Sequence, residues 1–254
     1  MSTQFKRFFS LDSPKAIKAR GFGYLNAINY MAPARLGGVG NLCPHASPGC
    51  LALCLGWHSG QAGIVAKDAP DSAMNGARRS RVAKARLFMK DRKAFVGEIQ
   101  AGIDRARRAA KRQGLKLCIR LNGATDIAWE GLAPQLFADN PDVQFVDYTK
   151  SKKRALAHAR GQLPANYHLT FSRSEINESD CDGVLQAGGN IAVVFAGQKP
   201  EMYRGCYVID GDESDLRHLD KRGTPGMFPG FVVALSPKGS KAKADRSGFV
   251  VRSC

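Results

Sequence analysis

The sequence has no apolar run long enough to cross a membrane, because none approaches the roughly 18 residues that a spanning helix needs. It also offers no apolar core of a secretory signal peptide, so we expect a cytoplasmic protein without a membrane partner. No Gly-x-Gly-x-x-Gly follows the first expected strand, and no Walker A sequence occurs. These absences argue against dinucleotide-binding and P-loop proteins.

Acidic residues are scarce: 22 Asp and Glu face 38 Lys and Arg, which gives a formal net charge of +16. The excess is concentrated in residues 78–113, where thirteen Arg and Lys face only three acidic residues. A polyanion would gain affinity from such a segment by releasing counterions, so we expect a nucleic acid or nucleotide partner. A solvated helix face is the alternative. The residues expected to contact phosphates are Arg78, Arg79, Arg81, Lys84 and Arg86.

Three of the seven cysteines, Cys43, Cys50 and Cys54, lie within twelve residues. In a reducing compartment such a cluster is more typical of metal binding than of disulfides, and thiolates favour zinc or an iron–sulfur cluster. His45 or His58 could complete a zinc site, whereas a 4Fe–4S cluster held by three cysteines keeps one iron open. Three reduced cysteines packed in a turn-rich segment are the alternative. The scattered cysteines are expected to be ordinary residues: Cys118, Cys181, Cys206 and Cys254.

The chain is expected to consist of a basic N-terminal segment, residues 1–21, and a single α/β domain, residues 22–254. Within the domain we place a Cys-rich metal loop at residues 41–58 and a basic helical segment at residues 77–113. Apolar residues recur at helical spacing in that segment. The two expected stripes are Val82, Ala85 and Met89, and then Phe95, Ile99 and Ile103.

Short apolar runs alternate with helix-like segments along the chain, which is typical of a parallel sheet covered by helices. Six or seven such units predict a partial or complete βα barrel of the TIM type, and an open parallel sheet is the alternative. The first expected strand lies within residues 22–33. The apolar runs that come after it span residues 115–121, 143–148, 167–171, 191–195, 207–209 and 231–235.

Polar residues close several of these runs. Because reacting groups gather at the carboxyl ends of parallel strands, we expect these residues to converge on one catalytic rim. Each taken alone could instead cap a helix or pair with a neighbour. The candidates are Arg120, Asn122, Asp126, Asp147, Lys150, Ser172 and Glu175.

Several motifs together resemble a bacteriophage and prophage family, the gene-product-88 group, over residues 22–251. The cysteine loop is more distantly similar to phage three-Cys-motif proteins with a radical-SAM-like barrel. That resemblance implies that Cys43, Cys50 and Cys54 bind a 4Fe–4S cluster with S-adenosylmethionine at the open iron, although this loop spaces its cysteines more widely than is common there. The motifs are CPHASPGCLALC, RLNGATDIAWE, DYTK, LTFSRSE, VIDGD and KGSKAKADRSGF.

Three functions follow as hypotheses. The first is a radical-SAM-like iron–sulfur enzyme that acts on nucleic acid or nucleotides. The second is a zinc-containing base-exchange enzyme, similar to a transglycosylase, in which Asp126 or Asp147 attacks the sugar C1′. The third is a zinc-bearing protein that binds nucleic acid without catalysis.

Overall fold

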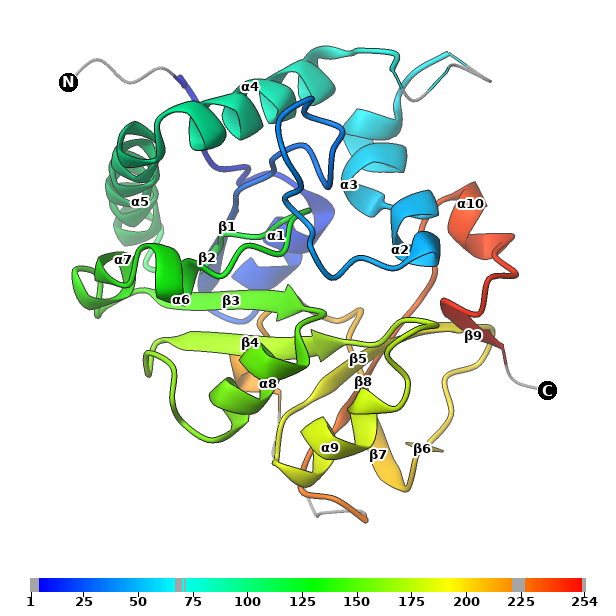
Figure 1. Cartoon of the computed structure of the whole chain (residues 1–254). Helices are drawn as coiled ribbons and strands as arrows, with labels where there is room; N and C mark the ends of the chain where they lie inside the picture. The colour runs from blue at the N-terminus through cyan, green and yellow to red at the C-terminus, as the bar shows by residue number, and fades with distance from the viewer. Residues whose placement is uncertain (1–4, 67–69, 71, 221–226, 253–254) are drawn as a thin grey trace. The chain divides into compact units, whose positions relative to one another are not determined.

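The computed structural model describes residues 5–66, 70, 72–220 and 227–252 (Figure 1). It divides into two compact units. Unit 1 comprises Met1–Pro44 and Cys54–Phe145, and unit 2 comprises His45–Leu53 and Val146–Cys254. The expected single domain over residues 22–254 stays a prediction.

Unit 1 is built around the parallel strands β1 and β2 and the start of β3. Its elements are α1 (Pro14–Arg20), β1 (Tyr24–Ile28), α3 (Leu55–His58), the 3₁₀ helix η1 (Gly60–Gly63), α4 (Gly76–Lys90), α5 (Arg92–Arg112), β2 (Lys116–Arg120), α6 (Trp129–Leu132), α7 (Gln135–Ala138) and β3 (Gln144–Thr149), whose last four residues belong to unit 2. The strand order is β1-β2-β3.

The long helices α4 and α5 supply most of the helical core of unit 1 (Figure 1). Asp91 caps α5 by accepting the N–H of Ala94, and Phe95, Ile99 and Ile103 are fully buried, as the second stripe predicts. The prediction of the first stripe, in α4, is wrong at its last residue. Met89 is exposed, and Phe88 is buried in its place against the rings of Phe95 and Trp129. The neighbouring aromatic ring buries more apolar area, so it decides which residue faces inward.

Lys84 of α4 is buried although it is a lysine. Its ammonium donates to the carbonyl of Phe8 and lies 4.7 Å from the centroid of the Phe8 ring. Burial lowers the pKa of Lys84 from an ordinary value of 10.5 to about 8, with a smaller contribution from the charge of Arg81. The charged amine therefore carries a desolvation cost in the folded state.

Replacing Lys84 with methionine is expected to remove a pH dependence of stability. Between pH 8 and pH 10.5 the folded protein has released this proton and the unfolded chain has not. The wild type therefore gains on the order of 3 kcal/mol relative to Lys84→Met as the pH rises through this window. Urea unfolding across the window measures the difference. Lys90→Met, at an exposed position of the same helix, retains Lys84 and should follow the pH trend of the wild type. Parallel curves for all three proteins would contradict the prediction.

Unit 2 holds the remaining strands. Its elements are α2 (Pro48–Ala52), the end of β3, α8 (Lys152–Ala159), β4 (Tyr167–Ser172), α9 (Asp180–Gln186), β5 (Ile191–Ala196), β6 (Met202–Tyr203), β7 (Cys206–Asp210), the 3₁₀ helix η2 (Arg217–Leu219), β8 (Val232–Leu235), α10 (Ser240–Lys243) and β9 (Val250–Arg252). The strand order is β3-β4-β5-β8-β7-β6, and β9 pairs with β5.

One face of the unit 2 sheet forms an apolar core beneath α8 and α9, which lie on the same side of β4 and β5 in Figure 1. Phe171 of β4, Val193 of β5 and Ala234 of β8 contribute to this core, together with Ala155 of α8 and Val184 of α9. Because neighbouring side chains in a strand point to opposite faces, the residues between these positions lie on the other face of the sheet.

The α/β class is confirmed. The nine strands of the described residues form a mostly parallel sheet, in which β6 and β7 pair antiparallel. The sheet is not closed among the described residues, so the complete barrel is not confirmed, whereas the open-sheet alternative agrees with the structure. The strand order is sequential in unit 1 and from β3 to β5 in unit 2, whereas β8 lies between β5 and β7, and β6 follows β7.

Candidate functional site

In unit 1 the loop after β1 lies against the loop after β2, at the carboxyl ends of both strands. The thiol of Cys43 donates to the carbonyl of Ala124 at 3.6 Å and accepts the N–H of Ala34 at 3.2 Å. The N–H of Asp126 donates to the carbonyl of Leu42 at 2.9 Å. Two of the expected site residues, Cys43 and Asp126, thus come together at this edge.

Cys54 borders the same loop. A side chain at Gly56 would collide with Ala124 and would begin 3.6 Å from the Sγ of Cys54. Glycine is therefore required where the backbone of α3 meets the loop after β2. Cys43 and Cys54 both lie beside Ala124, so unit 1 alone gathers two of the three clustered cysteines.

Arg81 lies beside Cys54 and is half-buried. Its guanidinium donates to the carbonyl of Gly56 and lies 4.7 Å from the ring centroid of Tyr30. Burial lowers the pKa of Arg81, while the nearby Tyr30 and Cys54 act in the opposite direction. A cation next to a cysteine favours its thiolate, which is the form that binds metals. Arg81 was expected at the surface as a phosphate contact, and the structure places it next to a cysteine.

The donor chemistry of the cysteine segment fits a soft metal. Cys43, Cys50 and Cys54 are half-buried, whereas Cys118, Cys181 and Cys206 are buried, as expected for the scattered cysteines; Cys254 lies outside the described residues. Burial raises the pKa of Cys181 to about 12, which makes this thiol inert. Within the described ranges, no three His, Cys, Asp or Glu side chains are grouped so that they could hold a metal ion. Cys43 and Cys54 belong to unit 1 and Cys50 to unit 2, so the three-cysteine site stays a prediction.

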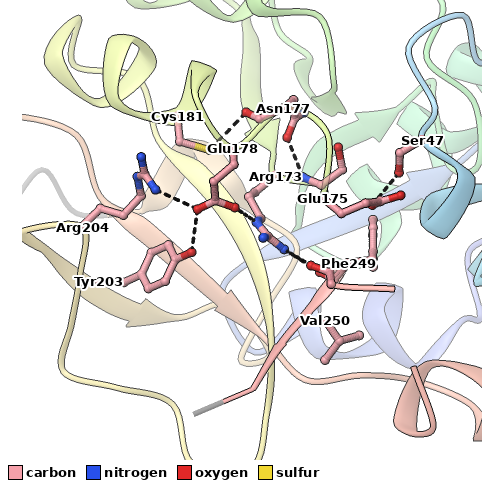
Figure 2. Close-up of polar contacts among 12 residues, drawn as sticks. Ser47, Arg173, Glu175, Asn177, Glu178, Cys181, Tyr203, Arg204, Phe249 and Val250 are labelled. Carbon is pink, nitrogen blue, oxygen red and sulfur yellow. Dashed lines mark hydrogen bonds and ion pairs between the residues drawn. The ribbon is translucent and has the colours of Figure 1, made fainter. Parts of the chain in front are cut away.

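Glu175 holds the short helix that carries Cys50, and all of these contacts lie within unit 2. Its carboxylate accepts the hydroxyl of Ser47 at 2.8 Å and the N–H of Gly49 at 2.7 Å, as Figure 2 shows for Ser47. Ser47 in turn caps α2 by accepting the N–H of Cys50 at 3.1 Å. Glu175 was expected to be a catalytic residue, and these contacts make it a positioning residue for the Cys50 segment.

Lys150 and Ser172 meet at the carboxyl ends of β3 and β4 in unit 2. The ammonium of Lys150 donates to the hydroxyl of Ser172 at 2.7 Å and to its carbonyl at 3.3 Å. It also lies 5.1 Å from the ring centroid of Phe249. Both residues are half-buried, so a cation and a hydroxyl are presented together at the edge where the sequence places them.

Asp147 of β3 does not join Lys150 and Ser172 at this edge of the sheet. It is fully buried and accepts the hydroxyl of Tyr167 at 3.0 Å, and Arg154 of α8 donates to the same hydroxyl at 3.1 Å. Asp147 therefore takes part in the packing of α8 on the sheet. In the base-exchange hypothesis this leaves Asp126 as the better placed of the two carboxylates.

Asn122 is engaged inside unit 1. Its side chain donates to the carbonyl of Ile127 and accepts the hydroxyl of Thr125, the N–H of Ile127 and the indole N–H of Trp129, at 2.9 to 3.2 Å. Asn122 is 1% exposed, so it organises the loop after β2. Arg120 ends β2 beside Ile28 and is half-buried.

The structure separates the five predicted phosphate-binding residues into two groups. Arg78 is buried and donates to the carbonyls of Trp57, Ala62 and Ala73, and Lys84 and Arg81 also point inward, as described above. Arg79 and Arg86 are exposed. The prediction of phosphate contact therefore depends on Arg79 and Arg86.

A network of ions in unit 2 was missed by the sequence analysis. The carboxylate of Glu178 accepts Arg173, the hydroxyl of Tyr203 and Arg204, and Arg173 also donates to the carbonyl of Phe249 (Figure 2). Arg204 has a positive φ of 54° and precedes Gly205 with a φ of 71°, as the tight turn between β6 and β7 requires. Hydrogen bonding to Asp182 raises the pKa of Arg204. In the sequence, the charged residues that follow β4 were the one indication of this network. The residues that pair with them lie far along the chain and show no pattern that would predict the contact.

The family model described as gene product 88 matches residues 8–253. The chain belongs to the gene product 88 family. This is a phage-type protein family, as the motifs of the sequence indicate. No curated protein and no solved structure matches the chain. Among the described residues of this gene product 88 protein, no helix has the length and apolar character needed to span a membrane.

Proposed function

We propose that this gene product 88 protein is an iron–sulfur enzyme that acts on nucleic acid or nucleotides, with Cys43, Cys50 and Cys54 as cluster ligands. The observation that carries the proposal is the placement of Cys43 and Cys54 beside Ala124, at the carboxyl edge of parallel strands. Reacting groups of parallel α/β enzymes gather at this edge. Cys50 joins the set through its position in the sequence between the other two.

The radical-SAM-like form of the proposal draws support from topology. The cysteine loop follows the first strand of a parallel sheet whose early strands pair in sequential order. A 4Fe–4S cluster bound by three thiolates would supply an open iron for S-adenosylmethionine. In unit 1 the cation of Arg81 lies beside Cys54. In unit 2 the pair of Lys150 and Ser172 is suited to hold an anionic group.

A polyanionic substrate is supported by one face of α4. Arg79, Arg86 and Lys90 are exposed and lie seven and four residues apart, which places them on one side of the helix. No carboxylate of the described ranges pairs with any of the three. In contrast, Arg107 of α5 is neutralised by Asp104 and Asp142. The α4 face therefore offers cations whose charge is available to phosphates.

Replacing Arg79, Arg86 and Lys90 with glutamine is expected to weaken nucleic-acid binding and to flatten its salt dependence. Three lost phosphate contacts should reduce the slope of log K against log salt concentration by about 2 to 3. Fluorescence anisotropy with labelled single-stranded and double-stranded oligonucleotides over a salt series measures both changes. Arg107→Gln removes a cation that is already paired and should leave the slope unchanged. Equal slopes for the triple variant and the wild type would refute the contact.

A nucleic-acid-binding protein without catalysis, carrying zinc, is the second candidate, and the α4 face favours it equally. A zinc-containing base-exchange enzyme would use Asp126, so Asp126→Asn should abolish its turnover. Metal and sulfide analysis of the full chain, purified without oxygen, separates these proposals. About four irons with matching sulfide would support the cluster enzyme. One zinc without iron would refute it and leave base exchange or simple binding.

A further inference from the structure

The loop after β7 crosses the face of the unit 2 sheet opposite α8 and α9. Phe171 and Ala234 point into the apolar core, so Thr170 of β4 and Val233 of β8 point to the opposite face. A side chain at Gly211 would collide with Val233, so the loop touches the sheet there. Further along the loop, η2 packs against β4.

This loop places a charged side chain in the interior of unit 2. Arg217 of η2 is 1% exposed. Its guanidinium donates to the carbonyl of Ser214, and its Nη1 lies 3.3 Å from a carboxylate oxygen of Asp220. Its Nε and Nη1 atoms have no hydrogen-bond acceptor among the described residues. The Nη1 atom thus meets Asp220 as an ion pair without a hydrogen bond, and the Nε atom has no acceptor within the described part of the chain. A buried guanidinium with donors left in this state carries a cost in free energy that a further acceptor would reduce.

A second unmatched group lies on the same face. Thr170 is fully buried, and its hydroxyl has no hydrogen-bond partner within the described ranges. Buried polar groups in proteins are almost always paired, and unmatched donors on one face indicate an absent acceptor. A hydroxyl and a guanidinium are donors that oxyanions accept well.

The charges around Arg217 leave room for an anion. Asp220 is its carboxylate neighbour, and burial raises the pKa of Asp220 to about 6, against the attraction of Arg217. Asp215 is also buried nearby and adds to this rise. The carboxylate of Asp212 is paired with another cation, because Lys199 donates to it at 2.9 Å. Asp220 can thus take up a proton and leave the charge of Arg217 to an incoming anion.

We propose that Arg217 and Thr170 form a binding site for an oxyanion, either a phosphate or a carboxylate, on the face of the unit 2 sheet opposite α8 and α9. This site is independent of the cysteine segment and of the α4 face. Its ligand accepts the Nε and Nη1 donors of Arg217 together with the hydroxyl of Thr170. Gly211 keeps the loop against the sheet, and a side chain there would start 2.9 Å from the Nη1 of Arg217.

Calorimetric titration of the full chain with inorganic phosphate and with succinate, at constant ionic strength, tests the site. The Arg79→Gln, Arg86→Gln and Lys90→Gln substitutions serve as the background, so that the α4 face does not contribute. We expect Arg217→Gln to weaken binding by about tenfold or more and the isosteric Thr170→Val to weaken it several-fold. Arg204→Gln, which removes a guanidinium already paired with Asp182 and Glu178, should leave the affinity within about twofold.

Tighter binding of phosphate would assign the site to a phosphate group, and tighter binding of succinate would assign it to a carboxylate. Binding of neither anion would overturn the proposal. The proposal would also be overturned if the Arg217→Gln variant bound the anion with the same affinity as the background protein. If Arg217→Gln does not fold, Thr170→Val decides, because it preserves the volume of the side chain, and an unchanged affinity in that variant overturns the site.

Discussion

Cys43→Ser and Cys54→Ser are each expected to remove most of the metal that the proposed function assigns to the wild type, whether iron or zinc. Serine is nearly isosteric, but its hydroxyl does not ionise near neutral pH and is a poor ligand for soft metals. A cluster held by three thiolates has no spare protein ligand, so the loss of one should lower the metal content at least tenfold. Elemental analysis after gel filtration, with the absorption spectrum, provides the measurement.

Cys206→Ser is the matched control, because Cys206 is buried in the unit 2 core and burial raises its pKa. Its metal content should equal that of the wild type. Cys50→Ser adds an independent test, since Cys50 joins the ligand set through the sequence alone. Full metal content in all three variants of the cysteine segment would show that these thiols bind no metal.

Asn122→Ala is expected to destabilise the protein by about 4 kcal/mol, because it leaves three donors and one acceptor without a partner inside unit 1. Asn122→Asp should cost less, since a carboxylate still accepts the N–H of Ile127 and the hydroxyl of Thr125. Urea unfolding followed by tryptophan fluorescence reports the change, because Trp129 is itself a partner.

Gln113→Ala, at the exposed end of α5, is the control and should change stability by no more than about 0.5 kcal/mol. A variant Asn122→Ala that unfolds like the wild type but loses turnover would restore the catalytic role that the sequence indicates. Such a result would mean that the four hydrogen bonds contribute little to folding.

The sequence predicts the strands of the parallel sheet well. Every apolar run corresponds to a strand, and α5 ends at Arg112, two residues before Gly114, whose φ is positive. The strands β6 and β9 were missed because two or three residues are too few to show alternation. In α4 the pattern assigns the buried position to Met89, and the choice between adjacent apolar residues depends on their neighbours in space.

The candidate site is predictable in composition but not in orientation. The meeting of Lys150 and Ser172 follows from the rule that parallel strands end at one edge. The inward direction of Arg78 and Lys84 does not, because residue type alone favours exposure for both. The sequence also provided no indication that Arg217 and Thr170 could form a site. Their significance depends on unmatched hydrogen-bond donors, which only a structure can reveal.

The support of α2 by Glu175 bears on the order in which the protein is made. Residues 47 and 49 leave the ribosome early, but the carboxylate that fixes them is synthesised 126 residues after Gly49. Until then the segment around Cys50 lacks this carboxylate, although local contacts such as the capping of α2 by Ser47 can already form. The cysteine segment therefore gains its final support late in translation, and a nascent chain that ends before residue 175 would carry Cys50 on an unanchored helix.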